Sequence, residues 1–109
     1  MDITNLRGIL ELLDDRSDFE ESQTPWIFGK NYFVRTVTMS LTGRLTGIYC
    51  HELTFSDAAW IADTGRFADA LAKSEFNEVE PFPEGRSIIV GRGGIIDAVE
   101  IDELPKEQK

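Results

Sequence analysis

This 109-residue sequence is poor in cysteine and contains only Cys50. One cysteine cannot form an internal disulfide, which fits a protein of the reducing cytoplasm. No apolar run approaches the roughly 20 residues that a membrane-spanning helix needs. The N-terminus, MDITNLRGIL, lacks the basic region followed by an apolar region that is typical of a secretory signal. We therefore expect a cytoplasmic protein with no membrane partner.

Basic residues are also scarce: the chain has 11 lysines and arginines against 20 aspartates and glutamates, a net charge of −9. The acidity lies in the flanks, since residues 1–25 carry seven acids and two bases and residues 97–109 carry five acids and two bases, whereas the centre is nearly neutral. Nucleic-acid affinity rests on lysine and arginine displacing counterions, so we do not expect a nucleic-acid partner. The acidity fits simple solubility, or an acidic decoy that imitates DNA in the basic groove of another protein.

The composition, 41% hydrophobic and 10% aromatic, indicates one folded globular domain. Four leucine and isoleucine residues recur on one helical face and predict a short N-terminal helix over residues 4–13, followed by an acidic linker that ends at residue 25. The domain is expected to span residues 26–102. Residues 103–109 form a charged tail that we expect to fray.

Runs of β-branched and aromatic residues predict three closely connected strands. The first covers residues 32–41, and the mixture of residue types on both of its sides leaves the inward face open. TGR at 42–44 predicts a tight turn, with Gly43 supplying a left-handed backbone. Residues 44–50 and 51–61 then form the second and third strands.

The pattern changes to helical spacing near residue 66. We predict a helix at about 66–75, with Asp63 or Thr64 as its N-cap, because a short side-chain oxygen there can accept a free backbone N–H. NEVEPFPEGR, residues 77–86, is predicted to be an extended connection, since its two prolines exclude a central strand.

The stretch SIIVGRGGIIDAVEI, residues 87–101, holds three glycines between two β-branched runs. A dinucleotide-binding loop would need a third glycine where Ile96 stands, and a helix after it. The residues that follow read as a strand instead. Glycines inside such sequence mark a bulge or a sharp bend, so we predict two final strands bent at the glycines.

The segments LTGRLTGIY (41–49), ELTFSDA (52–58) and VGRGGIIDAV (90–99) resemble the Sm-like small barrels, with Arg92, Gly93 and Ile96 on that family's Arg-Gly-x-x-Ile pattern. The resemblance implies a strongly bent five-stranded sheet that assembles into rings and, in the family, binds RNA. The chain departs from the family in two places. The turn YCHE has no asparagine at the first RNA-contacting motif, and the insertion at 60–85 is long. We therefore predict a mainly β fold, a five-stranded SH3-like or Sm-like small barrel with an N-terminal helix and one inserted helix.

YFVRTVT, DAAWIADTGRF, FNEVEPFP and VGRG together resemble a family of small uncharacterised proteins from tailed phages and prophages. This resemblance implies a viral or prophage origin and no particular activity.

Nothing in the sequence marks out an enzyme. Cys50 and His51 are adjacent, and neighbours on a strand point to opposite faces, so we expect neither a thiolate–imidazole pair nor a zinc site. No carboxylate lies in a motif with a catalytic partner, and we expect no cofactor.

Trp60 is the most unusual candidate. With Ile61 and Phe67 it could form a small core under the predicted helix, or it could belong to a contact surface, since tryptophan and arginine dominate the energetic anchors of interfaces. The binding or interface candidates are Trp26, Tyr49, His51, Trp60, Asp63, Thr64, Arg66, Arg92 and Gly93.

These features lead to a functional hypothesis: a non-enzymatic phage-type binding or assembly protein that acts as a homo-oligomer. A surface or pocket around Trp60, Arg66 and Arg92 would sequester or inhibit a host protein or a small anionic ligand. The alternatives are an Sm-like RNA-binding ring and a structural component of the virion.

Overall fold

A computed structural model describes residues 24–109, and the predicted helix at 4–13 lies outside them. The described chain forms six strands, one α-helix and one 3-10 turn. In chain order these are β1 (Asn31–Thr36), β2 (Ser40–Ile48), β3 (Glu52–Asp63), α2 (Phe67–Lys73), β4 (Glu78–Pro81), β5 (Ile88–Gly91), η1 (Arg92–Gly94) and β6 (Ile95–Glu100).

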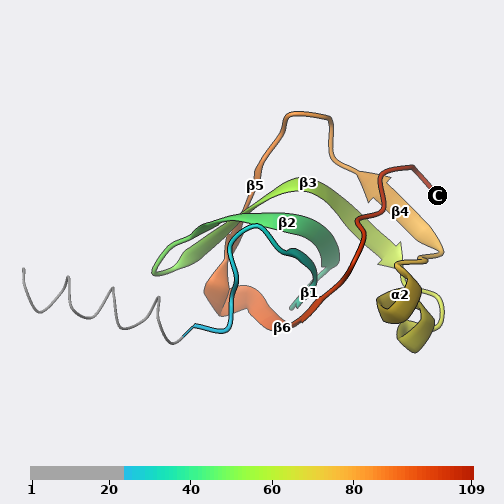
Figure 1. Ribbon diagram of the computed structural model, residues 1–109, viewed down its shortest axis with the longest axis horizontal. Coiled ribbons are helices and arrows are strands. Elements are labelled where there is room, and N and C mark those ends of the chain that lie inside the picture. The colour runs from blue at the N-terminus through green and yellow to red at the C-terminus, as the bar shows by residue number, and fades with distance from the viewer. Residues whose placement is uncertain (1–23) are drawn as a thin grey trace, which may run out of the picture.

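All strands belong to one antiparallel sheet in the order β4-β3-β2-β1-β6. Two strands pair with the outer side of the long strand β3: β5 pairs with its first half and β4 with its second half. The sheet is strongly curved, so that β5 and β6 both contribute to one core although they lie at opposite ends of the strand order (Figure 1). The fold is therefore an open barrel with an extension at the far end of β3.

The first core fills the inside of this curve. It is built from alternate residues of the strands, which point to one face of a sheet. Trp26 packs on it from the segment before β1, with its ring 4.9 Å from that of Tyr32 and 6.4 Å from that of Phe55. The buried members of this core are Tyr32, Val34, Leu41, Leu45, Leu53, Phe55 and Val90.

A second core lies on the opposite face of the sheet, under α2 and the tail. Phe33 is its centre, stacked on Phe76 at 5.8 Å and edge-on to Phe67 at the same distance. Its buried members are Phe33, Ala59, Ile61, Ala70, Phe76, Val79 and Ile101. β1 is buried on both faces, which explains why its sequence does not distinguish one inward side.

The mainly β fold with one inserted helix is confirmed, but the strand number is six rather than five. The additional strand is β4, in the connection that was predicted to be merely extended. Pro81 ends it and lies opposite Ala59. A proline is tolerated here because β4 is the last strand in the sheet order and position 81 faces away from β3, so the missing N–H breaks no bond between β3 and β4.

The predicted first strand and turn were wrong in position. The chain turns at residues 37–39, within the expected strand, where the Thr36 hydroxyl donates to the Met39 carbonyl and accepts the Met39 N–H. Gly43 lies inside β2 and has no positive φ. It is required by packing: a Cβ at Gly43 would lie 2.8 Å from the Phe55 Cβ.

The predicted helix is confirmed at residues 67–73, but neither predicted cap is used. Arg66 occupies the N-cap position without a side-chain cap bond. Asp63 instead accepts the Gly65 N–H at 2.8 Å and the Thr64 hydroxyl donates to the Gly65 carbonyl, so both stabilise the turn before the helix.

The charged tail does not fray as expected. Lys109 and Val79 exchange two backbone hydrogen bonds of 3.0 Å, which places the end of the tail along the outer side of β4. Leu104 packs on the second core from the same segment. The packing of Leu104 and the backbone bonds of Lys109 thus hold two points of the tail against the domain.

Candidate functional site

The glycine-rich stretch joins the two open edges of the sheet. β5 pairs only with β3, β6 pairs only with β1, and η1 connects them, as the sequence predicted for two strands bent at the glycines. Within residues 24–109, no further strand pairs with the outer side of β5 or with the outer side of β6. Such edges present unpaired N–H and C=O groups and are templates for pairing with another chain.

The third edge of the sheet, on β4, differs from these two. The reciprocal hydrogen bonds between Lys109 and Val79 cover it, and the Gln108 side-chain amide donates to Glu80 at 3.4 Å. Among the residues that the structure describes, the tail therefore covers the β4 edge, and none covers the outer sides of β5 and β6.

Both open strands carry an exposed isoleucine. Ile89 on β5 is 66% exposed and Ile96 on β6 is 64% exposed, while their neighbours Ile88 and Ile95 pack on the first core. Adjacent β-branched residues on a strand face opposite ways, so each pair presents one apolar side chain to the core and one to solvent. An apolar edge of this kind is a candidate contact surface.

The two open edges differ in charge. Arg86 and Arg92 flank β5, whereas Asp97 and Glu100 lie on β6 and form ion pairs with Arg35 and Lys30. Asp97 accepts two hydrogen bonds from Arg35 on β1, one of 2.8 Å from Nε. These bonds, and to a lesser degree the charge of Arg35, lower the pKa of Asp97 from its ordinary value and keep it ionised.

Nothing in the described chain requires glycine rather than another residue at Gly91 and Gly93 of this junction. Gly91 and Gly93 have no positive φ, and a Cβ at either would meet no atom within 4 Å. Glycine in a strand weakens it unless something needs the space, such as another backbone that approaches closely.

Arg92, Gly93, Tyr49 and His51 come together at one end of the barrel. The Arg92 guanidinium donates to the Tyr49 carbonyl at 2.7 Å, and its backbone N–H donates to the His51 carbonyl at 2.9 Å. Arg92 thus ties the β5–β6 junction to the β2–β3 turn. Cys50 and His51 lie in this turn rather than on a strand, and their Sγ and Nε2 atoms are 3.8 Å apart, closer than the strand argument predicted.

Trp60, Asp63, Thr64 and Arg66 lie at or beyond the other end of the 12-residue strand β3. Within one copy, Arg92 therefore does not share a site with Trp60 and Arg66. Trp60 is 42% exposed and does not belong to the second core, whereas Ile61 is buried there. Trp26 takes no part in either group, because it covers the first core.

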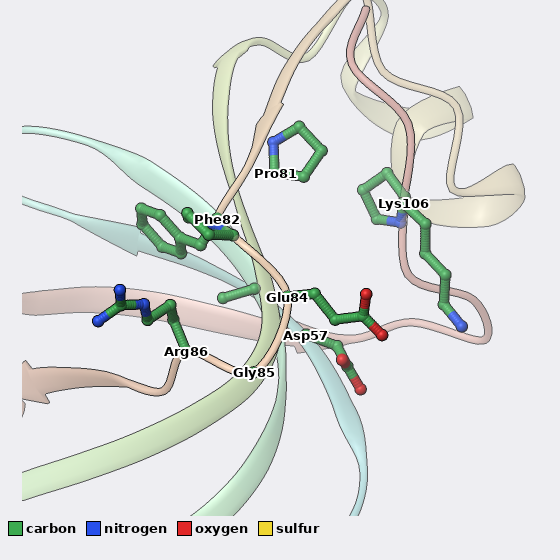
Figure 2. A pocket seen from close by; sticks show the side chains of 10 residues that line it. Asp57, Pro81, Phe82, Glu84, Gly85, Arg86 and Lys106 are labelled. Carbon is green, nitrogen blue, oxygen red and sulfur yellow. The ribbon is translucent and has the colours of Figure 1, made fainter.

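A cleft of about 310 Å³ lies where β3 passes from β4 to β5 (Figure 2). Asp57 forms part of it with a left-handed backbone, φ 52°, and its carboxylate accepts a hydrogen bond of 2.6 Å from Arg44. Figure 2 shows Asp57 and Glu84 directed toward the side of Lys106, with Arg86 pointing away. Charges of both signs line this cleft, so its chemistry selects no class of ligand.

Within residues 24–109, no group of three or more histidine, cysteine, aspartate or glutamate side chains is placed to hold a metal ion. None of the helices in this range is long and apolar enough to cross a membrane.

Comparison with known proteins adds little to this geometry. No protein-family profile matches the chain, and no curated protein matches it in sequence. A heptameric archaeal Sm protein has a similar solved structure, with a TM-score of 0.49 and 17% identity over 69% of this chain and 90% of that chain. A similarity this low carries no conclusion about function. The resemblance to phage proteins stays a prediction that no family match supports.

Residues 24–109 therefore form a mainly β fold, a six-stranded antiparallel sheet curved into an open barrel with one α-helix. The glycine junction and Arg92 could be predicted from the sequence, whereas the exposed isoleucines beside them were not predicted. Their signal was present in the doublets at 88–89 and 95–96, since two adjacent β-branched residues give a strand two apolar faces.

Proposed function

We propose that this protein is a non-enzymatic binding or assembly protein that works as a homo-oligomer, in which β5 of one copy pairs with β6 of the next. The observation that carries the proposal is the contrast between the edges. β5 and β6 are open and expose Ile89 and Ile96, whereas the protein's own tail covers β4.

Charge disfavours one of the possible edge pairings. Joining β5 to β5 would bring Arg86 and Arg92 of two copies together, which costs free energy, whereas joining β5 to β6 avoids this repulsion. Unlike edges make a head-to-tail contact, and repeated head-to-tail contacts close into a ring or continue as a filament. A ring of this kind is also what the resemblance to the Sm-like small barrels implies.

We propose assembly ahead of RNA binding, which is the alternative function of an Sm-like ring. Arg92 is the residue that the Sm-like resemblance assigns to RNA, and one of its guanidinium N–H groups donates to the Tyr49 carbonyl. The turn at 49–52 also lacks the expected asparagine. In a phage-infected cell, the oligomer would act in the cytoplasm by sequestering a host protein or an anionic ligand, or as part of the virion.

The mass of the assembled protein tests the proposal. We expect native mass spectrometry and light scattering to show a closed oligomer for the unaltered chain, and monomers for Ile89→Lys and for Ile96→Lys. Both side chains are exposed, so these changes leave the monomer folded. The matched control is Phe28→Lys, which is 69% exposed but lies in the turn before β1.

A mixture of the two isoleucine variants tests the head-to-tail order. Each variant keeps one intact edge, so an equal mixture should form a heterodimer and nothing larger. If Ile96→Lys alone forms dimers, β5 pairs with β5 and the head-to-tail order is wrong. A monomeric unaltered chain, or equal dissociation of the Phe28 control, would overturn the assembly proposal.

A further inference from the structure

The β3–β4 extension has two faces of opposite character. On one face Ile61 and Val79 are buried in the second core under α2. On the other face Trp60 lies directly opposite Glu80, and Asp63 lies opposite Glu78. Directly opposed residues of an antiparallel pair point to the same side of a sheet, so these four side chains share the face that α2 does not cover.

This face exposes an aromatic ring among carboxylates. Trp60 is 42% exposed, and Asp63, Glu78 and Glu80 are exposed around it. We call this set the Trp60 face. A large exposed tryptophan is costly to leave in water and is a common anchor of protein interfaces.

The acids of this face are a cost to the fold. Asp63 and Glu78 are directly opposed like charges, an arrangement that destabilises a β-ladder. The ion pairs formed within residues 24–109 are those of Lys30, Arg35 and Arg44 with other acids. No basic side chain of the described chain thus neutralises the Trp60 face.

The tail does not supply a cation either. Lys109 is exposed but pairs with Val79, so its side chain points to the same side of β4 as Val79 and away from the Trp60 face, while Gln108 points to the other side and bonds Glu80. The residue that the tail places on the Trp60 face is therefore neutral. The face is left with three carboxylates beside one ring.

We propose that the Trp60 face is a docking surface for a lysine- or arginine-bearing segment of a partner protein. An alkylammonium or guanidinium group can lie over the indole ring while its charge is met by the surrounding carboxylates. Nucleic acids and anionic membranes carry the same sign of charge as the face and are repelled by it. The surface includes no residue of β5 or β6, so this interaction does not depend on the proposed assembly.

Fluorescence anisotropy with a labelled peptide tests the docking surface. The probe is an eight-residue peptide of alternating arginine and serine, and the matched probe replaces each arginine with glutamate. We expect saturable binding of one arginine peptide per copy, weakened by salt, and no binding of the glutamate peptide. Trp60→Ala should weaken binding at least about tenfold, and Trp60→Phe by less, because phenylalanine keeps a ring.

Charge variants separate a built surface from general acidity. Asp63→Asn, Glu78→Gln and Glu80→Gln combined should abolish saturable binding. The control combines Glu84→Gln, Glu103→Gln and Glu107→Gln, which removes the same charge from exposed positions off the face. An equal loss in the control, or unchanged binding in Trp60→Ala, would overturn the proposal. Because these exposed substitutions spare the core, the charge variants remain informative even if Trp60→Ala unfolds.

Discussion

The two cores of this protein are held by different means. The first core is closed by strands, and in the described part of the chain Trp26 is the one residue outside the sheet that packs on it. The second core depends on segments distant in sequence, because α2, the loop with Phe76 and the tail all pack on the outer face around Phe33. The first core thus defines the barrel, and the second joins later elements to it.

The difference explains how the open edges are positioned. Val90 of β5 is a buried member of the first core, and Ile95 and Ala98 of β6 pack against it. The second core instead positions β4 and the tail, which close the remaining edge. Changes in the two cores should therefore have different consequences for assembly.

The largest effect is expected from Phe55→Ala. Phe55 is fully buried in the first core, so its truncation should lower the free energy of unfolding by about 3–5 kcal/mol. The loss should be seen in chemical denaturation, with every slowly exchanging amide of the sheet affected.

Phe76→Ala is the matched change in the second core, since Phe76 is also buried. We expect hydrogen exchange to accelerate in α2, at Val79 and at Lys109, while Val34 and Leu45 remain protected, because local opening can occur without global unfolding. If all amides respond equally to Phe76→Ala, the two cores form one cooperative unit and the distinction fails.

A gain of stability is expected from Thr42→Val. Thr42 is fully buried, lies between Phe33 and Ala59 in the ladder, and its hydroxyl has no hydrogen-bond partner among the described residues. Valine keeps the shape and removes the unsatisfied group, so we expect a gain of about 1 kcal/mol. Thr42→Ser is the control: it keeps the hydroxyl and loses a methyl group, so it should be destabilising. A loss of stability in Thr42→Val would show that the hydroxyl is satisfied in solution.

The sequence predicted the order of elements better than their boundaries. The hairpin at 37–39 was missed because Val37 and Thr38 have high strand propensity, while the glycine at 43 suggested a turn. Gly43 is in fact needed by the Phe55 ring across the sheet, and such a contact cannot be read from local sequence.

The candidate site was predictable in its chemistry but not in its arrangement. Arg92 and Gly93 were found because glycines in strand-like sequence indicate a bend. That Arg92 and Trp60 lie at opposite ends of β3 follows from the length and pairing of β3, which only the assembled sheet reveals. Likewise, the acids of the Trp60 face come from both β3 and β4. Residues 64–77, which include α2, separate these strands in the sequence, so only the pairing of the strands brings the acids together.

The smallest effect is expected from Asp97→Asn. Arg35 bonds Asp97 across β1 and β6, and its guanidinium lies 5.3 Å from the centre of the Phe67 ring, so one side chain links the edge of the barrel to the second core. The pair is exposed, and exposed pairs contribute little. Because the bonds from Arg35 lower the pKa of Asp97, its contribution is present above the ordinary carboxyl pKa of about 3.9 and is lost as the pH falls through the folded value. Melting temperatures should therefore show a small deficit for Asp97→Asn at neutral pH that shrinks below about pH 4. A constant deficit at every pH would mean that Asp97 acts through packing rather than through its charge.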